Sequence, residues 1–547
     1  MRRHAASSPP WATAKPPQQQ PGPNPGRAAG GARCRHRLCL ALPLLWLAAL
    51  LSGCAALPDN QPRIESHYMA DSAGPLARGV HERTAGQGGK SGFYLLYDGL
   101  DAFAARALLA NWASGSIDAQ YYLFHDDLTG NLLLERLLAA ADRGVRVRLL
   151  IDDMATKGRD QDFAALDAHP HFELRLFNPW ASRGARTLEM LTRFGTVTRR
   201  MHNKSFTVDG AVSVVGGRNI GDEYFSANPS VEFGDLDVLA VGPVTREVAA
   251  AFDAYWNHEL AYPASRIVRE VPAADHLEAL RLRLQAEAAK AYTSGYAERV
   301  RTSRLVEQLA GQQLDLHWGK AAVFADQPDK LLTSPEQRAT HMGPQLRAEV
   351  EDVARELLIF SPYFVPGSDG VDWLAGLAAR GVRVRIVTNS LASNDVGVVH
   401  AGYAKYRKRL LRAGVELYET KATPAAQDAR HDHLGSSSSA SLHAKTFTFD
   451  RERLFVGSLN LDPRSAVLNT EMGIVFTSPE LGAIVGDWFD NRLHETAFTL
   501  RLNQDGDIEW LDHQAGGEVI YTLEPNTGFW QRLGIWFARL LPIEGQL

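Results

Sequence analysis

Two short segments of this chain carry the same reactive side chains at the same spacing. Both follow the pattern H-x-K-x4-D, and in both a glycine comes seven residues after the aspartate and an asparagine ten residues after it. Every member of the second set lies 241 positions after its counterpart in the first. The duplicated motif consists of His202, Lys204 and Asp209, and of His443, Lys445 and Asp450.

The residue types in each copy suit phosphoryl transfer. A histidine and a lysine two positions apart on an extended strand share a face, so an acid, base or nucleophile lies beside a fixed positive charge. A single copy would also fit an ordinary edge strand with solvated polar residues. Two copies facing each other supply two histidines, one to attack phosphorus and one to protonate the departing alcohol. Duplication therefore favours a shared active site.

Six neighbouring residues are candidates for supporting this chemistry. The asparagines would bind phosphate oxygens with the lysines, small residues would let phosphate approach the backbone, and a carboxylate would orient each histidine. The motif aspartates are candidates either for catalysis or for bracing the fold. No spacing typical of zinc or calcium ligands occurs, so we expect no metal and no cofactor. The supporting candidates are Asn219, Gly217 and Asp235 after the first motif, and Asn460, Ser458 and Glu471 after the second.

The elements that must position the motifs also occur twice. Residues 100–177 alternate strand-like and helical segments in a β-α-β-α-β order. The sequence GVRVR at 144–148 recurs letter for letter at 381–385. This alternation predicts an α/β fold of two pseudo-symmetric units. Each unit would be a mostly parallel or mixed sheet flanked by helices, with one central active site shared between them.

Composition and periodicity divide the chain into seven segments. They are a disordered Pro/Gly-rich extension (1–32), a lipoprotein-type signal (33–54), a tether (55–91), a first α/β unit (92–262, motif 197–224), a helical connector (263–314), a second α/β unit (315–500, motif 438–465) and a tail with an amphipathic helix (501–547).

The N-terminal region has the pattern of a bacterial export signal. Three arginines within 33–37 precede an apolar run at 38–51, which is too short for a comfortable membrane span. Small residues before Cys54 resemble the lipoprotein signal, in which that cysteine carries the lipid anchor. A plain signal peptide and an uncleaved anchor are the alternatives. We expect attachment at the periplasmic face of the cell envelope. Because Ala55 follows the cysteine, where inner-membrane lipoproteins usually have aspartate, the outer membrane is slightly favoured.

The charge of the chain argues against a nucleic-acid substrate. The formal net charge is −5, and residues 1–53 contribute seven positive side chains and no negative one, so the remainder carries −12. Proteins that grip nucleic acid through its phosphates are usually basic. We therefore expect phospholipids and a membrane as partners, and no nucleic acid.

The duplicated motif resembles that of the phospholipase D superfamily, whose members build one active site from two HKD motifs. The resemblance covers about 90–500. Longer stretches are similar to the cardiolipin synthase C-type branch, as is the closing Leu541-Pro542. A lipoprotein-type leader behind a Pro-rich extension departs from that branch. The stretches are RRMHNKSFTVDG (199–210), VGGRNIGDEYF (215–225), VVHAGYAKYRKRLLRAGVELYE (398–419) and SLHAKTF (441–447).

The resemblance implies two phospholipase D-like units and an activity. It implies transfer of a phosphatidyl group onto phosphatidylglycerol, with a second phospholipid such as phosphatidylethanolamine as donor. It also implies a phosphohistidine on His202, with His443 as acid and base, although pseudo-symmetry leaves that assignment open. Hydrolysis of phospholipids is the alternative, and a nucleic-acid phosphodiesterase or a non-enzymatic envelope protein are further ones.

Two surfaces are candidates for contact with lipid. The segment 181–200 contains five arginines, which would form either a solvated face or a rim that attracts phosphate headgroups. The tail segment 529–541 is rich in aromatic residues with two arginines, which is typical of an interfacial helix and equally of one docked on the body.

Overall fold

The first of two mixed sheets holds the first motif. The computed structural model describes residues 57–70, 72–228, 234–268, 271–311, 314–394, 396–422, 442–514, 516–540 and 545; the predicted extension and the signal with Cys54 lie outside this set. Strands β2, β3 and β4 are parallel, and the other pairings are antiparallel. The strand order is β8 (Ala261–Pro263), β4 (Phe172–Phe177), β3 (Arg146–Asp152), β2 (Ser116–Tyr121), β5 (Ser205–Val208), β6 (Val212–Gly216), β7 (Asp237–Val241), β1 (Ser91–Leu96) and β9 (His317–Gly319).

The second sheet repeats this topology. Seven consecutive strands, from β13 to β10, correspond in order and direction to β4 through β1 of the first sheet. The strand order is β10 (Ala321–Ala325), β16 (Met472–Thr477), β15 (Arg453–Gly457), β14 (Thr446–Phe449), β11 (Glu356–Phe360), β12 (Arg383–Asn389), β13 (Glu416–Thr420), β17 (Ala497–Leu502), β18 (Ile508–Gln514) and β19 (Gly517–Tyr521).

Helices cover the sheets, and their starts follow local sequence signals. The carboxylate of Asp98 accepts the N–H groups of Leu100 and Asp101, and that of Asp127 accepts the N–H of Gly130, so each caps a helix. The helices of the first half are α2 (Pro75–Thr84), α3 (Gly99–Trp112), α4 (Leu128–Asp142), α5 (Asp160–Asp167), α6 (Arg186–Thr192), α7 (Phe194–Val197), α8 (Val244–Trp256), α9 (Ala264–Ile267), α10 (His276–Thr293), α11 (Gly295–Arg301) and α12 (Arg304–Ala310).

The described residues of the second half contain fewer helices. Segment 397–412 forms two of them, which are separated at Lys405 and Tyr406. The helices are α13 (Gly343–Glu351), α14 (Gly367–Ala379), α15 (Gly397–Ala404), α16 (Arg407–Arg412), α18 (Pro479–Thr496) and α19 (Phe529–Ala538).

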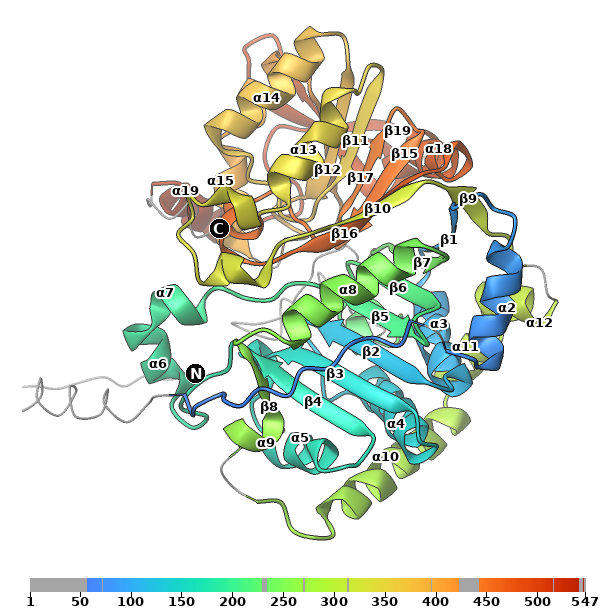
Figure 1. The fold of residues 1–547 in the computed structure, drawn as a ribbon. Helices are drawn as coiled ribbons and strands as arrows, with labels where there is room; N and C mark the ends of the chain where they lie inside the picture. The colour runs from blue at the N-terminus through green and yellow to red at the C-terminus, as the bar shows by residue number, and fades with distance from the viewer. Residues whose placement is uncertain are drawn as a thin grey trace, which may run out of the picture. The chain divides into compact units, whose positions relative to one another are not determined.

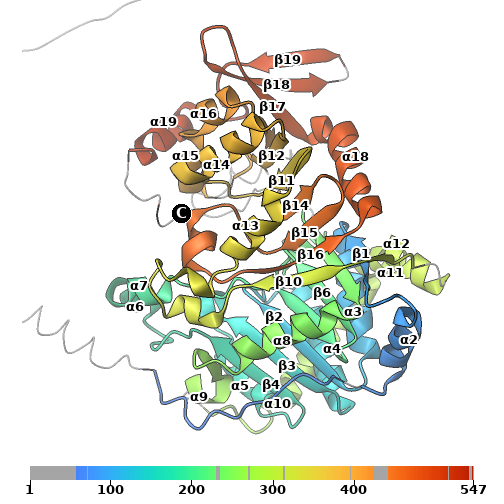
Figure 2. The same ribbon diagram turned by 45° about the horizontal axis from the view of Figure 1, so that its top comes forward.

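The two sheets meet through apolar side chains on β1, β6 and β7 of the first and β15 and β16 of the second. The rings of Phe93 and Phe476 stack across this interface with centroids 4.3 Å apart. Figures 1 and 2 show the contact between the blue-green first half and the yellow-red second half. The two motifs therefore lie on strands of sheets that pack directly against each other.

The architecture confirms the predicted fold of two α/β units with mixed sheets. Two segments are placed differently from the sequence-based division. Strand β9 follows the expected connector but joins the first sheet, and β18 and β19, expected in the tail, extend the second sheet. Within the described residues, no helix has both the length and the apolar character needed to cross a bilayer.

Candidate active site

Each His–Lys pair lies just before the strand that was expected to carry it. Strands β5 and β14 begin at Ser205 and Thr446, one residue after each lysine. Both histidines are almost buried, with side chains 11% and 12% exposed. The hairpins β5–β6 and β14–β15 thus hold the two pairs at equivalent places in the two units.

Each histidine is held by the other unit. Nδ1 of His202 lies 2.8 Å from Oε2 of Glu471, and its backbone N–H donates to the carbonyl of Thr470 at 2.9 Å. Nδ1 of His443 lies 2.6 Å from Oδ2 of Asp235, and its N–H donates to the carbonyl of Gly234 at 2.8 Å. The two orienting carboxylates predicted from the sequence are therefore exchanged between the units, and this exchange joins the two motifs into one site.

The two lysines bring positive charge to both histidines. Nζ of Lys204 donates to the carbonyl of His202 at 2.7 Å, and Nζ of Lys445 donates to the carbonyl of His443. Burial lowers the pKa of Lys204 well below its usual value, although the carboxylate of Glu471 acts in the opposite direction. Each lysine also lowers the pKa of the histidine in the opposite motif, so both ammonium charges act on both rings.

The first pair carries a group that titrates near neutral pH. Burial, followed by the charges of Lys204 and Lys445, holds the pKa of His202 well below 6.5. Burial raises the pKa of Glu471 to about 7, against the opposing charge of Lys204. When Glu471 is ionised it accepts a hydrogen bond from Nδ1–H of His202, which leaves Nε2 with a lone pair for attack.

In the second pair, a neutral histidine lies beside an ionised carboxylate at neutral pH. Burial and the charge of Lys445 lower the pKa of His443 to about 3. Burial alone would raise the pKa of Asp235, but His443, Lys445 and Arg218 together hold it below its ordinary value. Asp235 is therefore ionised and fixes the Nδ1–H tautomer of His443.

The two small residues expected to admit phosphate instead support the carboxylates. Oγ of Ser458 donates to Glu471 at 2.5 Å and accepts the N–H of Met472 at 3.0 Å. A Cβ at Gly217 would lie 2.3 Å from Oδ1 of Asp235, so only glycine leaves room for that carboxylate. Both residues thus act on the histidines through their acidic partners.

The two motif asparagines are not equivalent. Oδ1 of Asn219 accepts the N–H of Leu123 at 3.2 Å, and its Nδ2 donates to the hydroxyl of Tyr224 at 2.9 Å. The side chain of Asn219 is therefore engaged in holding a loop. The buried Oδ1 of Asn460 has no hydrogen-bond partner among the described residues, so Asn460 is the better candidate for contact with substrate.

The motif aspartates lie at the far ends of β5 and β14 from the histidines. Asp209 accepts the N–H groups of Gly115 and Ser116 at 2.7 and 2.9 Å, and the Ser114 hydroxyl at 2.9 Å. Asp450 accepts three consecutive N–H groups, from residues 354 to 356, at 2.7–3.0 Å. Both have positive φ, at the turn of the hairpin. Their contacts are those of residues that brace the strands.

Two tyrosines next to the histidines were not predicted. The ring of Tyr122 meets His202 edge-on with centroids 5.1 Å apart, and Tyr224 meets His443 in the same way at 5.2 Å. Both tyrosines come from the first unit. Tyr122 could have been noticed, because Tyr363 lies 241 positions after it, as in the motifs.

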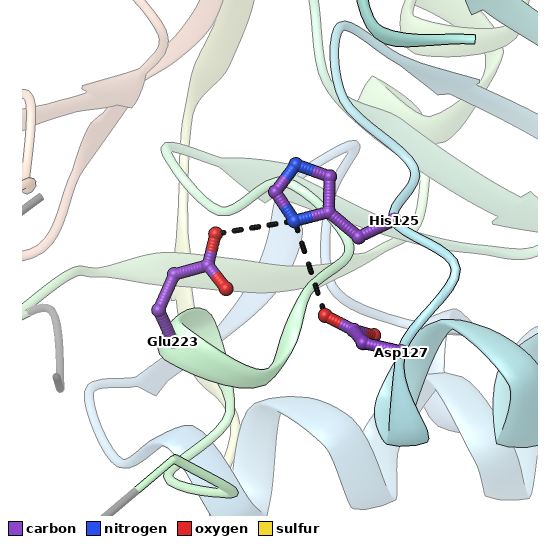
Figure 3. Close-up of side chains that lie close together, drawn as sticks. All are labelled: His125, Asp127 and Glu223. Carbon is purple, nitrogen blue, oxygen red and sulfur yellow. Dashed lines mark ion pairs between the residues drawn. The ribbon is translucent and has the colours of Figure 1, made fainter. Parts of the chain in front are cut away.

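A loop near the site differs in charge between the units. Figure 3 shows His125, Asp127 and Glu223 pointing toward one another, with Nδ1 of His125 3.4 Å from Glu223 and 3.9 Å from Asp127. In the described part of the chain this is the one group of three such side chains close enough to share a cation. Asp127 already accepts the N–H groups of Gly130 and Asp222. The position 241 residues after Glu223 is Arg464, whose charge lowers the pKa of His202 after the larger effects of burial and the lysines.

Comparison with known proteins agrees with this geometry. The family described as "Cardiolipin synthase, PLD-like domain" matches residues 109–256 and 347–493, one match for each unit. The chain belongs to this family of the phospholipase D superfamily. It is accordingly an enzyme, a phosphatidyltransferase by class.

Individual members of the cardiolipin synthase family are similar over most of their length. Cardiolipin synthase C of Escherichia coli (strain K12) is 45% identical over 459 residues, covering 83% of this chain and 96% of that protein. The cardiolipin synthase of Halalkalibacterium halodurans is 25% identical over 424 residues, covering 76% and 68%. The crystal structure of phosphatidylserine synthase from Haemophilus influenzae covers 86% of this chain and all of that one, with a TM-score of 0.52 and 14% identity, and so shares its fold.

Proposed function

We propose that this protein makes cardiolipin from phosphatidylglycerol and a second phospholipid, phosphatidylethanolamine, through a phosphohistidine. Nε2 of His202 attacks the donor phosphorus, and the bond from phosphorus to the headgroup oxygen breaks. His443 gives the leaving ethanolamine its proton. A glycerol hydroxyl of phosphatidylglycerol then attacks phosphorus while His443 takes its proton, which releases cardiolipin and frees His202.

The observation that carries this proposal is the exchange of carboxylates between the units. A ping-pong reaction needs two histidines with separate roles and fixed tautomers. Glu471 and Asp235 orient the rings from opposite units, so Nε2 of each is left for chemistry. The geometry supports one nucleophile and one acid/base rather than two independent sites.

The lysines would bind the phosphate that reacts. Lys204 and Lys445 act electrostatically on both histidines, which places their charges where negative charge develops. A bound phosphate anion would raise the pKa of His443, since opposite charge favours the imidazolium. That shift would let a ring that is neutral at rest act as the acid for the leaving alcohol. Asn460 would add a polar contact, and Asp209 and Asp450 would brace the strands.

Attachment to a membrane fits this substrate class. The sequence before Leu57 carries the apolar run and Cys54. We propose that lipidated Cys54 holds the enzyme at the periplasmic face of the envelope, with the outer membrane favoured over the inner membrane. A cell fractionation with labelled palmitate tests this. Label that is absent, or unaffected by Cys54→Ser, would contradict it.

Hydrolysis is the second candidate, since water and an alcohol compete for the same phosphohistidine. A phosphodiesterase of nucleic acids is less well supported, because the chain after residue 53 carries a charge of −12. The deciding experiment incubates the enzyme with phosphatidylglycerol and phosphatidylethanolamine, each labelled separately in its headgroup and its acyl chains. We expect cardiolipin and free ethanolamine in equal amounts.

Three other outcomes contradict the proposal. Phosphatidic acid without cardiolipin indicates hydrolysis. Release of glycerol without ethanolamine means that phosphatidylglycerol is also the donor. Cleavage of plasmid DNA, but of neither lipid, indicates a nuclease. His443→Ala is the matched control, because it should remove both cardiolipin and ethanolamine.

A further inference from the structure

Helix α19 exposes a surface that a folded protein normally covers. Five large apolar side chains in and just after this helix are between 53% and 79% exposed, and none of its residues is buried. Its other face rests on α15, and Gln531 donates to the carbonyl of Leu391, in the turn that follows β12. The exposed side chains are Phe529, Trp530, Trp536, Phe537 and Leu540.

A second apolar stripe lies on α6 and α7. Leu188 and Leu191 lie three residues apart on α6 and so share a face, and Phe194 begins α7. The three side chains are 42%, 78% and 48% exposed. The opposite side is anchored, because buried Glu189 accepts the N–H groups of Ala181 and Ser182 at 3.0 and 2.9 Å. This anchoring keeps the apolar side chains of the stripe on the outer surface of the protein.

The arginines around this stripe do not form a free cationic rim. Arg183 pairs with Asp153 and Asp160, and Arg200 lies 3.3 Å from Asp152. Arg186 and Arg193 also pair with carboxylates, of Asp153 and Glu189. These pairs fold the segment, and Leu188, Leu191 and Phe194 remain exposed on its surface.

Both stripes lie on the same side of the molecule. Figures 1 and 2 place α6, α7 and α19 on the left in both views. The described chain also starts there. Asn60 donates to the carbonyl of Ala261 in β8 at 3.1 Å, and the charges of both Arg193 and Asp59 act on the neighbouring Tyr262. The first described residues therefore lie against β8, on the same side of the molecule as α6 and α7.

The α6–α7 segment also leads directly to the active site. Val197, at its end, is buried, and the carbonyl of Thr198 accepts a hydrogen bond from Arg464 at 3.0 Å. Met201 donates its N–H to Asp152 at 3.0 Å, one residue before His202. A surface seated on α6 and α7 would thus lie close in sequence and space to the first histidine.

We infer that α6–α7 and α19 form a two-part docking surface for a phospholipid bilayer and hold the active site against it. The inference rests on the proposed function, in which both substrates are membrane lipids. Leucine and phenylalanine would enter the acyl boundary from α6–α7, and tryptophans with Arg532 and Arg539 would anchor α19 at the headgroups. The charge of the α19 segment also suits a phospholipid surface, because residues 528–540 contain two arginines and no acidic residue.

The test uses single cysteines in the full chain. Cys34, Cys39 and Cys54 are its three cysteines and are replaced by serine, and then Leu191→Cys, Trp530→Cys or Leu282→Cys is introduced. Leu282 is 58% exposed on α10, away from α6, α7 and α19 in both views, and is the matched control. The protein is reconstituted into vesicles of phosphatidylglycerol and phosphatidylethanolamine and treated with a water-soluble maleimide.

We expect modification at 191 and 530 to be at least tenfold slower in vesicles than at 282, whereas all three react at similar rates without vesicles. Equal rates in vesicles would overturn the docking surface. Slow reaction at 191 and 530 without vesicles would also overturn it, in favour of a second protein copy as the occupant.

Activity separates this inference from the proposed function. We expect Leu188→Ser/Leu191→Ser/Phe194→Ser to lower cardiolipin synthesis on vesicles about tenfold and to leave synthesis in mixed micelles unchanged. The control Leu282→Ser/Ile484→Ser/Ile520→Ser, at equally exposed positions elsewhere, should change neither. An equal loss in both lipid forms would overturn docking. A parent chain that makes no cardiolipin yet shields residue 191 contradicts the proposed function alone.

Discussion

The two halves of the active site have the same backbone but different side chains around their histidines. His202 pairs with Glu471, a carboxylate that a serine hydroxyl holds and whose pKa burial raises to about 7. His443 pairs with Asp235, which packs against a glycine and stays ionised. Duplication thus preserved the framework, while the pKa values of the two carboxylates moved in opposite directions.

The approach to each histidine shows the same divergence. Asp152, at the end of β3, accepts the N–H of Met201, and Asn389, at the end of β12, exchanges two hydrogen bonds with Leu442. Met201 and Leu442 each precede a histidine. A charged group supports the first approach and a neutral amide the second. An ionised Asp235 would suit a histidine that carries a transferred proton, which agrees with the proposed role of His202 as the nucleophile.

Replacement of the histidines should have the largest effect and should separate their roles. We expect His202→Ala to abolish turnover, by about 10⁴-fold or more, because no covalent intermediate can form. His443→Ala should lose about 10²- to 10⁴-fold, but should still react once with a donor whose leaving group needs no proton. A single-turnover burst with an activated phosphatidyl ester measures the difference. A burst from His202→Ala and none from His443→Ala would reverse the assignment.

Replacement of the exchanged carboxylates should have the second-largest effect on activity. We expect Glu471→Gln and Asp235→Asn each to lower kcat by about 10²- to 10³-fold, because the ring loses its fixed tautomer. Glu471→Gln should slow formation of the intermediate, and Asp235→Asn should slow proton transfer, which an activated ester bypasses. If the activated ester rescues both variants equally, the two carboxylates do not serve different histidines.

The dependence of activity on pH should report on the ionisation of the His202–Glu471 half of the active site. Glu471 must be ionised to accept Nδ1–H of His202, and burial raises its pKa to about 7. Activity should therefore rise with pH through about 7 and fall tenfold for each unit below it. Ser458→Ala removes the hydroxyl that favours the carboxylate, so the midpoint should move to higher pH. An unchanged midpoint would show that another group controls the profile.

The charged loops should give a smaller effect. Arg464 lies near His202, while its counterpart Glu223 belongs to the acidic group beside Tyr224. We expect Arg464→Gln to raise KM several-fold, with a weaker dependence on salt, because a positive charge near an anionic lipid is lost. Glu223→Gln should not raise KM. Equal changes in both variants would mean that this charge difference has no part in substrate binding.

The motif aspartates should affect stability and leave the chemistry intact. Asp209 is buried and accepts several hydrogen bonds, so Asp209→Ala should lower the free energy of unfolding by about 2–4 kcal/mol. Asp450 is more exposed, so Asp450→Ala should cost about 1 kcal/mol. Thermal denaturation measures both. A loss of kcat in fully folded protein would instead make either residue part of the chemistry.

Much of this arrangement could be predicted because it repeats. The constant spacing of 241 residues identified both motifs, and the strand and helix alternation gave the α/β units. The exchange of Glu471 and Asp235 could not be read from spacing, because each contact joins residues more than 200 positions apart. Pairing across units depends on how the sheets pack, which local patterns do not specify.

Other features were hidden because their residue types have common alternative roles. Tyr122 and Tyr224 resembled core aromatics, and Asn219 resembled Asn460 although its amide is used by a loop. The arginines of 181–200 suggested a cationic rim, but most of them pair with carboxylates. Leu188, Leu191 and Phe194 are exposed on two short helices, which the basic composition of the segment obscured.

The most direct test of the account is to identify the histidine that carries the phosphatidyl group. The full-length enzyme is mixed with phosphatidylethanolamine for one turnover, quenched in alkali to preserve phosphohistidine, and its peptides are sequenced by mass spectrometry. Because the two half-sites differ, we predict the adduct on His202. The amount of adduct should be larger when His443 is replaced by alanine and the donor is activated. An adduct on His443, or none on either histidine, would contradict the account.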